Sequence, residues 1–402
     1  MLLLLVSFLF VCNFCVGFLW LNSNDYYKYQ WALKNNGNFV IDRGILADNH
    51  SVMYFDKGIV DRDFYFDSNV VNELKKGKLD PGKSYANYDF DIRWEAGYSI
   101  FKSVLNKRDA IVAIIDTGID INHPDLKENI WVNNLEIPGN GIDDDNNGYV
   151  DDIYGYNFID DNGIVFDNNL SDIHGTHAAG TMIAKHNGNG INGIAYDSHI
   201  KVMSLKILDK NGKGYMSNLI KAVNYAYKMG ARICNISLGA YSYDESLDTI
   251  IKSYPDMLFV VAAGNGANYI GYSLDTKDVY PAKFQYDNVI SVANASFDSS
   301  RYVSSNYGTP VTIFAPGTFI LSTVPDNNYG FLTGTSMAAP FVSATCAMIY
   351  SAYPNVPISA YKNIIIMGAE KHVELLDLCK SDGLLNIGNV MLLANSFNEG
   401  GR

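Results

Sequence analysis

Short, mostly apolar runs alternate with amphipathic segments through much of this 402-residue chain, and this alternation limits the possible folds more than any other feature. The runs are residues 110–115, 200–208, 233–237, 258–263 and 289–293. Runs of this kind are typical of parallel strands that are buried on both faces of a sheet. Between two of them, Leu219, Val223 and Tyr227 keep the spacing of one helix face. The pattern predicts an α/β protein, a three-layer sandwich with a mostly parallel central sheet and helices on both faces.

Three short motifs add a chemical signal to this pattern. Asp116 begins the sequence Asp-Thr-Gly-Ile-Asp, His174 begins His-Gly-Thr-His-Ala-Ala-Gly, and Ser336 lies in Gly-Thr-Ser-Met-Ala-Ala-Pro. A serine hydroxyl is a poor nucleophile until a histidine accepts its proton, and a carboxylate fixes the tautomer of that histidine. The chain supplies all three groups among small residues, which let a substrate backbone approach.

Together the motifs resemble those of the subtilisin-like serine proteases (subtilases), in which the acid, the histidine and the serine follow one another in this order. The resemblance extends over about residues 25–395. It implies a subtilisin-like fold and a serine endopeptidase that hydrolyses polypeptides through an acyl-enzyme. In that reaction Asp116 orients the imidazole, His174 acts as general base and then as general acid, and Ser336 attacks the scissile carbonyl.

The resemblance also implies an oxyanion hole and a substrate channel. Subtilases carry an asparagine after Ala-Ala-Gly that donates its side-chain amide to the oxyanion. Asn265 holds this position, and the backbone N–H of Ser336 is the expected second donor. The segment 233–239 is similar to the strand that pairs with an extended substrate. Its small residues suggest a first specificity pocket that is open to large apolar side chains. The implied pocket walls are Ser237, Leu238 and Gly239 on one side and Ala262, Ala263 and Gly264 on the other.

Each motif also has a plainer interpretation. Asp116 could be a turn residue, Ser336 a helix cap and Asn265 a turn asparagine. His177 follows His174 by three residues and raises the question of zinc, but the His-Glu-x-x-His pattern is missing, which favours a packed helix residue. An α/β-hydrolase would need Gly-x-Ser-x-Gly and the triad in the order serine, acid, histidine, whereas here the serine comes last. The alternative that stays open is a catalytically inactive binding or scaffold protein on the subtilase fold.

The composition restricts the partners. Hydrophobic residues make up 48% of the chain and charged residues 18%, which is typical of a globular protein. The net charge of −13 gives no basic surface for nucleic acid. Of the five cysteines, Cys12 and Cys15 lie in an apolar leader and the other three are scattered, so no disulfide framework is expected. The chain is expected to act as a monomer on polypeptide substrates.

The N-terminal region differs from the family pattern. Residues 1–21 are almost wholly apolar and are favoured as a signal peptide, although they lack a positive n-region and are long enough for a membrane anchor. Either interpretation predicts a secreted or cell-surface protein. Residues 22–90 contain an insert that subtilases do not require, and this segment is either an unusual prosegment or, as we favour, a decoration of the mature enzyme. Residues 91–395 form the expected catalytic domain, and residues 396–402 a flexible tail.

An acidic stretch predicts a calcium site. Asp143, Asp145 and Asn147 offer oxygen ligands at alternating positions before a glycine, as in the first half of an EF-hand loop. Asp151 lies at the ninth position of this loop, and because Tyr154 replaces the usual twelfth ligand, Asp152 is expected to close the site. Carboxylates this close repel one another unless a cation neutralises them. A second calcium site, with Asp125 and Asn187 as ligands, is implied only by the resemblance, with Asp25 or Gln30 completing it.

Overall fold

The computed structural model describes residues 27, 30–35, 87, 89–167, 170–209, 212–266 and 270–400, together with five short strands before residue 86. Within these residues the largest sheet has nine strands, in the order β15-β16-β12-β11-β10-β9-β6-β8-β7. All neighbouring pairs in it are parallel except β15 and β16. The bounds are β6 Ala110–Asp116, β7 Gly155–Asn157, β8 Ile200–Lys206, β9 Ile233–Ile236, β10 Leu258–Ala262, β11 Val289–Ala295, β12 Ile313–Pro316, β15 Glu370–Lys371 and β16 Gly383–Leu384.

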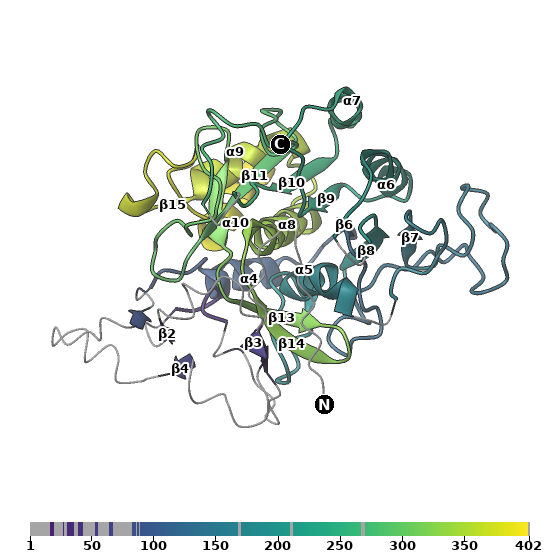
Figure 1. Ribbon diagram of the computed structural model, residues 1–402, viewed down its shortest axis with the longest axis horizontal. Helices are drawn as coiled ribbons and strands as arrows, with labels where there is room; N and C mark the ends of the chain where they lie inside the picture. Colours follow the sequence, from purple (N-terminus) through teal and green to yellow (C-terminus); the bar gives the residue numbers. More distant parts are fainter. Residues whose placement is uncertain are drawn as a thin grey trace.

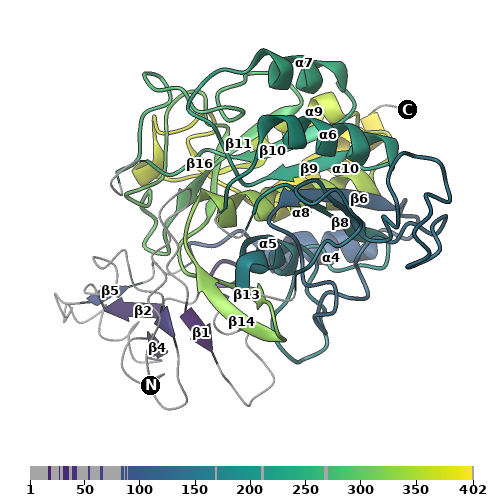
Figure 2. The same ribbon diagram turned by 45° about the vertical axis from the view of Figure 1, so that its right-hand side comes forward.

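Helices cover both faces of this sheet (Figures 1 and 2). The helices α6 (Met216–Lys228) and α7 (Glu245–Ser253) lie together on one face. On the other face, α8 (Thr335–Ala352) packs against the central strands and against α5 (Ile173–Ile183). Further helices are α4 (Trp94–Ser103), α9 (Ile358–Gly368) and α10 (Ile387–Gly400), and α10 packs against the other two and α8. The predicted three-layer α/β sandwich is confirmed.

The central helix α8 contains a proline without ending there. Pro340 has no backbone N–H, so the carbonyl of Ser336, four residues earlier, lacks its usual helical donor. The hydroxyl of Ser237, at the end of β9, supplies the missing hydrogen bond to that carbonyl at 3.1 Å. The replacement bond fixes the first turn of α8 against the edge of the sheet where β9 ends.

Smaller sheets lie beside the main body. The hairpin of β13 (Ile320–Val324) and β14 (Asn328–Leu332) leads into α8, and β14 pairs with β1 (Gly17–Leu19), which in turn pairs with β3 (Met53–Tyr54). A three-stranded sheet contains β2 (Phe39–Asp42), β4 (Phe64–Phe66) and β5 (Lys83–Tyr85). Two short 3₁₀ turns are η2 (Leu170–Asp172) and η4 (Val373–Leu375).

Two expectations concern the ends of the chain, namely the N-terminal leader and the C-terminal tail. Apart from the backbone of β1, residues 1–21 lie outside the described part, and with them the choice between signal peptide and anchor. None of the helices that the described residues form is both long and apolar enough to cross a bilayer. Residues 396–400, which were expected to belong to the tail, lie in α10, and this helix continues to Gly400.

Candidate active site and cation-binding loop

Asp116 and His174 form a short buried contact. Asp116 is the last residue of β6, and His174 is the second residue of α5; they are 1% and 6% exposed. The His174 Nδ1 atom lies 2.7 Å from each carboxylate oxygen of Asp116. A ring nitrogen must carry its proton to bond a carboxylate, so the contact selects the tautomer in which Nε2 of the neutral ring is an acceptor. This is the state that a general base requires.

The small residues of the two motifs allow this close approach. A methyl group placed on Gly175 would lie 2.2 Å from the carbonyl oxygen of Gly118, so the two segments meet backbone to backbone. The Gly175 N–H donates to Thr117 Oγ1 at 3.1 Å, and the Asp120 N–H donates to Thr176 Oγ1 at 2.9 Å. The end of β6 and the start of α5 are therefore joined on both sides of the Asp116–His174 contact.

Ser336 is the second residue of α8 and is 1% exposed. Its hydroxyl donates to the carbonyl of Ser237 at 3.1 Å, which is the reciprocal of the bond from the Ser237 hydroxyl. Because α5 and α8 pack against each other, His174 and Ser336 lie in the first turns of neighbouring helices. The sheet and these two helices thus hold the three residues of the predicted triad.

Two hydrogen-bond donors border one space beside Gly334. Asn265 Oδ1 accepts from the N–H and the hydroxyl of Thr335 at 3.1 and 3.3 Å, which leaves the amide nitrogen directed elsewhere. A methyl group on Gly334 would lie 3.4 Å from Asn265 Nδ2 and 3.8 Å from the backbone nitrogen of Ser336. These nitrogen atoms belong to the two donors expected for an oxyanion hole, and both lie beside the same small volume.

The expected pocket walls also come together, with an additional residue between them. Ser237, Leu238 and Gly239 follow β9, while Ala262 ends β10 and precedes Ala263 and Gly264; β9 and β10 are parallel neighbours, so these ends share one edge.

Val279 lies between the two walls. Its Cγ1 atom would be only 3.1 Å from a methyl group on Gly239 and 3.3 Å from one on Gly264. Reciprocal backbone bonds of 2.8 Å between Ala240 and Tyr280 hold this segment in place. No motif in the sequence indicated Val279 as a neighbour of these two glycines.

His177 is a packed helix residue, as expected. The residue is fully buried, and its Nε2 atom lies 2.8 Å from the carbonyl oxygen of Ile320. Burial lowers the pKa of His177 to about 3, so the ring is neutral. Among the described residues, one cluster of carboxylate, histidine or cysteine side chains has the spacing of metal ligands. His177 does not belong to this cluster.

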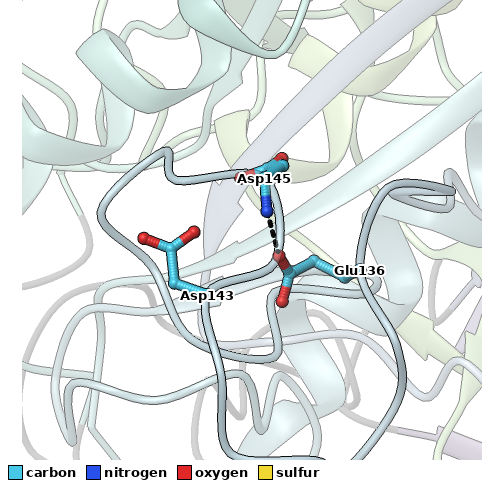
Figure 3. Close-up of side chains that lie close together, drawn as sticks. All are labelled: Glu136, Asp143 and Asp145. Carbon is cyan, nitrogen blue, oxygen red and sulfur yellow. Dashed lines mark hydrogen bonds between the residues drawn. The ribbon is translucent and has the colours of Figure 1, made fainter.

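That group consists of Glu136, Asp143 and Asp145, whose ligand atoms lie within 4.8 Å of one another (Figure 3). Glu136 is buried, and its Oε1 atom accepts from the N–H groups of Asp144 and Asp145 at 2.8 and 3.2 Å. Two of the predicted ligands, Asp143 and Asp145, are therefore adjacent. Glu136 lies upstream of the EF-hand-like pattern, so nothing in that pattern indicated it.

The other predicted ligands of the loop make further hydrogen bonds, and Asn147 stays beside Asp145. Asp151 accepts from the backbone N–H groups of residues 139–141 at 2.8 to 3.2 Å. Asp152 is fully buried and accepts from the side-chain amides of Asn133 and Asn147, both at 2.9 Å. The amide of Asn147 also reaches Asp145 at 3.2 Å. In place of the expected closure by Asp152, the structure puts Glu136 beside Asp143 and Asp145.

The residues of the second implied site meet at the loop after α5. Asp125 is buried, which raises the pKa of its carboxyl, while hydrogen bonds from Tyr329, Ile191 and Asn187 act in the opposite direction. The Tyr329 hydroxyl donates to Asp125 Oδ2 at 2.6 Å. Gln30 binds the same loop through the backbone of Asn192, at 2.9 and 2.8 Å. Asp25 lies outside the described residues.

The architecture matches that of a solved cold-adapted subtilisin-like serine proteinase, with a TM-score of 0.55, 21% identity, and coverage of 75% of this chain and 92% of that one. Residues 107–386 match the model of the subtilase family. Subtilisin-like protease 1 of Plasmodium falciparum (isolate 3D7) is 35% identical over 71% of this chain and 44% of its own length. Subtilisin DY of Bacillus licheniformis is 33% identical over 63% of this chain and 80% of its own length. The chain belongs to the subtilase family, and it spans less than half the length of the Plasmodium falciparum and Plasmodium vivax relatives.

Proposed function

We propose that this chain is a serine endopeptidase that cleaves polypeptides through Asp116, His174 and Ser336. The observation that carries the proposal is the contact of 2.7 Å between His174 Nδ1 and both oxygens of Asp116. It leaves Nε2 as the proton acceptor beside the helix that bears Ser336. Family membership supports the same reaction.

The proposed reaction has two halves. The Ser336 hydroxyl turns from the Ser237 carbonyl to His174 Nε2, gives up its proton and attacks the scissile carbonyl carbon. Asn265 Nδ2 and the Ser336 N–H bind the resulting oxyanion, and one such donor contributes about 2.7–4 kcal/mol, a magnitude known from mutagenesis of subtilisin, itself a subtilase. His174 then protonates the leaving amine, and water hydrolyses the acyl-enzyme by the same steps.

The substrate is proposed to be an extended polypeptide with a small side chain before the cleaved bond. Residues 237–239 offer an edge to which a peptide strand can pair. Val279 fills part of the space between Gly239 and Gly264. A pocket that is narrowed in this way accepts alanine or serine more readily than phenylalanine.

Glu136, Asp143 and Asp145 are proposed as ligands of one calcium ion. Calcium binds oxygen ligands at about 2.3–2.6 Å, so ligands on opposite sides of one ion are about 5 Å apart. The three carboxylates, with ligand atoms within 4.8 Å, fit around one such ion. Backbone carbonyls and water would complete its coordination. Asp125 and Asn187 are proposed as ligands of a second calcium ion, which would tie the loop after α5 to the N-terminal segment.

Residues 30–35 are proposed to remain part of the mature enzyme. Trp31 is 2% exposed, and its indole N–H donates to the Thr318 carbonyl at 2.9 Å. The Asp89 N–H donates to the Asn35 carbonyl at 2.9 Å, so the two ends of the insert meet. The insert then decorates a secreted or cell-surface monomer with a catalytic domain over residues 91–395. A mature N-terminus near Trp94, found by sequencing the exported protein, would contradict this organisation.

A fluorophosphonate probe tests the central proposal. The probe is expected to label the wild-type protein at Ser336, with loss of labelling in Ser336→Ala and hydrolysis of a peptide library only by the labelled protein. Ser359→Ala, which alters an exposed serine of α9, serves as the matched control and should leave labelling unchanged. A folded wild-type protein that is neither labelled nor active would favour the scaffold alternative.

A further inference from the structure

Lys206 is a buried cation beside the candidate active site. It ends β8, and its Cα atom is paired in register with that of Asp116 at the end of β6. Only 2% of the residue is exposed, although a lysine is rarely buried unless a partner neutralises it. Neither the proposed triad nor the oxyanion hole uses this side chain.

The ammonium group of Lys206 has three partners. It donates to Asp172 Oδ1 at 2.6 Å, lies 3.0 Å from Asp167 Oδ2, and donates to the backbone carbonyl of Thr117. The Asp172 side chain is fully buried, whereas 34% of the Asp167 side chain is exposed. The enclosed contacts are therefore those with Thr117 and Asp172.

The two enclosed partners belong to the two halves of the Asp116–His174 pair. Thr117 directly follows Asp116, and Asp172 directly precedes α5, two residues before His174. The Asp172 side chain makes no capping bond to α5, so its role there is not that of an ordinary helix cap. One ammonium group thus connects the end of the strand that bears the acid to the start of the helix that bears the histidine.

We propose that Lys206 is a positioning residue for the reaction: by binding Thr117 and Asp172 at once, it fixes the distance between β6 and α5 and so the orientation of the His174 ring toward Ser336. The proposal rests on the proposed function. A displacement of about 1 Å in a catalytic group can cost about 100-fold in rate, so a link at this place is expected to act on kcat. The specificity pocket is built from β9 and β10, and KM is expected to stay nearly constant.

The competing explanation is that Lys206 only neutralises a buried carboxylate. Removing one partner of a buried ion pair is destabilising because the other charge is left uncompensated. A single substitution of Lys206 would therefore confuse loss of positioning with loss of stability. The two aspartates around Lys206 allow these effects to be separated.

Asp172→Ala and Asp167→Ala form the matched pair for the first test. Each removes one carboxylate and leaves Lys206 the other carboxylate and the Thr117 carbonyl, but only Asp172→Ala breaks the link to α5. We expect kcat on a peptide substrate to fall roughly 10- to 100-fold in Asp172→Ala and less than threefold in Asp167→Ala, with KM within twofold in both. Equal kcat values in the two variants would overturn the proposal.

The double variant Lys206→Met/Asp172→Asn is the second test. It removes both charges, so its melting temperature is expected to recover toward that of the wild type relative to Lys206→Met alone. We expect kcat to remain low, and the downfield proton resonance of the His174 Nδ1–H bonded to Asp116 to shift or broaden. Wild-type kcat with an unchanged resonance would show that the pair only neutralises charge. Should the double variant not fold, the comparison of the two aspartate variants decides alone.

A failure of the proposed function would look different from a failure of this inference. If the wild-type protein is neither labelled by a fluorophosphonate nor active, the endopeptidase proposal fails before Lys206 is tested. If the wild-type protein is active and Asp172→Ala is labelled at Ser336 as fast as Asp167→Ala, the endopeptidase proposal stands and the positioning role of Lys206 is refuted.

Discussion

The carboxylate at the active-site edge of the central sheet and those in the acidic loop of residues 133–152 are held by different kinds of contact. Asp116 is 1% exposed and meets His174, 58 residues later in the chain. In the loop, Asp143 and Asp145 are only half-buried, and their oxygens accept from backbone and amide groups of the same loop, such as the Asn147 N–H at 3.0 Å. One site depends on the packing of the whole domain, and the other on a local turn.

This difference indicates how the two sites can be separated by experiment. Substitutions at the active-site edge should change the reaction with little effect on unfolding, provided that they conserve shape. Substitutions in the loop should change unfolding with little effect on the reaction, because the loop contributes no proposed catalytic residue.

Asp116→Asn is expected to produce the largest effect. The amide conserves the shape of the side chain but no longer requires the proton on His174 Nδ1, so the ring can take the wrong tautomer. We expect kcat to fall about 10⁴-fold, the loss known for the same substitution in a serine protease that has this triad on another fold. The melting temperature should change by less than 3 °C, roughly 1 kcal/mol or less for a domain of this size. An Asp116→Asn protein with wild-type activity would contradict the assignment of Asp116 as the acid of the triad.

Val279→Ala is expected to change selectivity. Loss of two methyl groups deepens the space between Gly239 and Gly264, and a single methylene in an apolar pocket alters discrimination by roughly 10- to 200-fold. We expect kcat/KM for phenylalanine relative to alanine, before the cleaved bond, to rise by at least about tenfold. Val223→Ala, an equally buried valine in α6, is the control and should leave this ratio unchanged. An unchanged ratio in Val279→Ala would exclude this residue from the pocket.

Most of the fold could be predicted from the sequence because its signals are local. The apolar runs at 110–115 and 258–263 became β6 and β10, with bounds that differ by one residue at their C-terminal ends. The proposed triad residues lie in short motifs whose glycines are explained by a close approach, as at Gly175. A catalytic residue of this kind requires a particular side chain and also small neighbours in the chain. One short segment of sequence is therefore enough to predict it.

The residues that sequence analysis missed depend on contacts that no motif spacing specifies. Glu136 joins the acidic group from outside the EF-hand-like spacing, and Val279 reaches the pocket from a loop without a motif of its own. Lys206 did leave a signal, a charged residue within a buried strand, but its partner Asp172 is 34 residues away in the chain. Spacing alone cannot show such partners, because the packing of β8 against the segment before α5 decides them.

Glu136→Gln tests the loop side of the comparison. The substitution weakens the proposed calcium site, so the stabilisation by millimolar calcium should fall. An ion present at 100 times its Kd stabilises the folded state by about 2.7 kcal/mol. We therefore expect a chelator to lower the wild-type melting temperature by about 5 °C or more, and Glu136→Gln to lose most of this response. The kcat of the variant should stay within twofold of the wild type.

Glu374→Gln, an exposed glutamate outside the loop, is the control for this experiment and should respond to the chelator as the wild type does. Calcium titration of both variants by calorimetry would show whether the loop is the site that binds. A wild-type melting temperature that does not respond to the chelator would contradict both proposed calcium sites. A chelator response that is retained in Glu136→Gln would leave the site at Asp125 and Asn187 as its source.

The last expected effect, that of His177→Gln, is on the pH dependence of stability. Burial holds the pKa of His177 near 3, against an ordinary value of 6.5. Between these values the unfolded chain binds a proton that the folded protein does not, so stability falls as the pH falls from about 6.5 toward 3. His177 contributes at most about 1.4 kcal/mol to this loss for each pH unit. The variant should show a shallower decline of its melting temperature over this range.

The slope, and not the stability at one pH, is the quantity to compare, because the substitution also changes packing inside α5. Burial lowers the pKa of His123 to about 4 as well, and that of His186 is lowered too, so the wild-type slope contains their contributions. These contributions cancel in the difference between wild type and His177→Gln. Equal slopes in the wild type and His177→Gln would mean that His177 can be protonated in the folded state, and that α5 is less tightly packed beside His174 than its burial indicates.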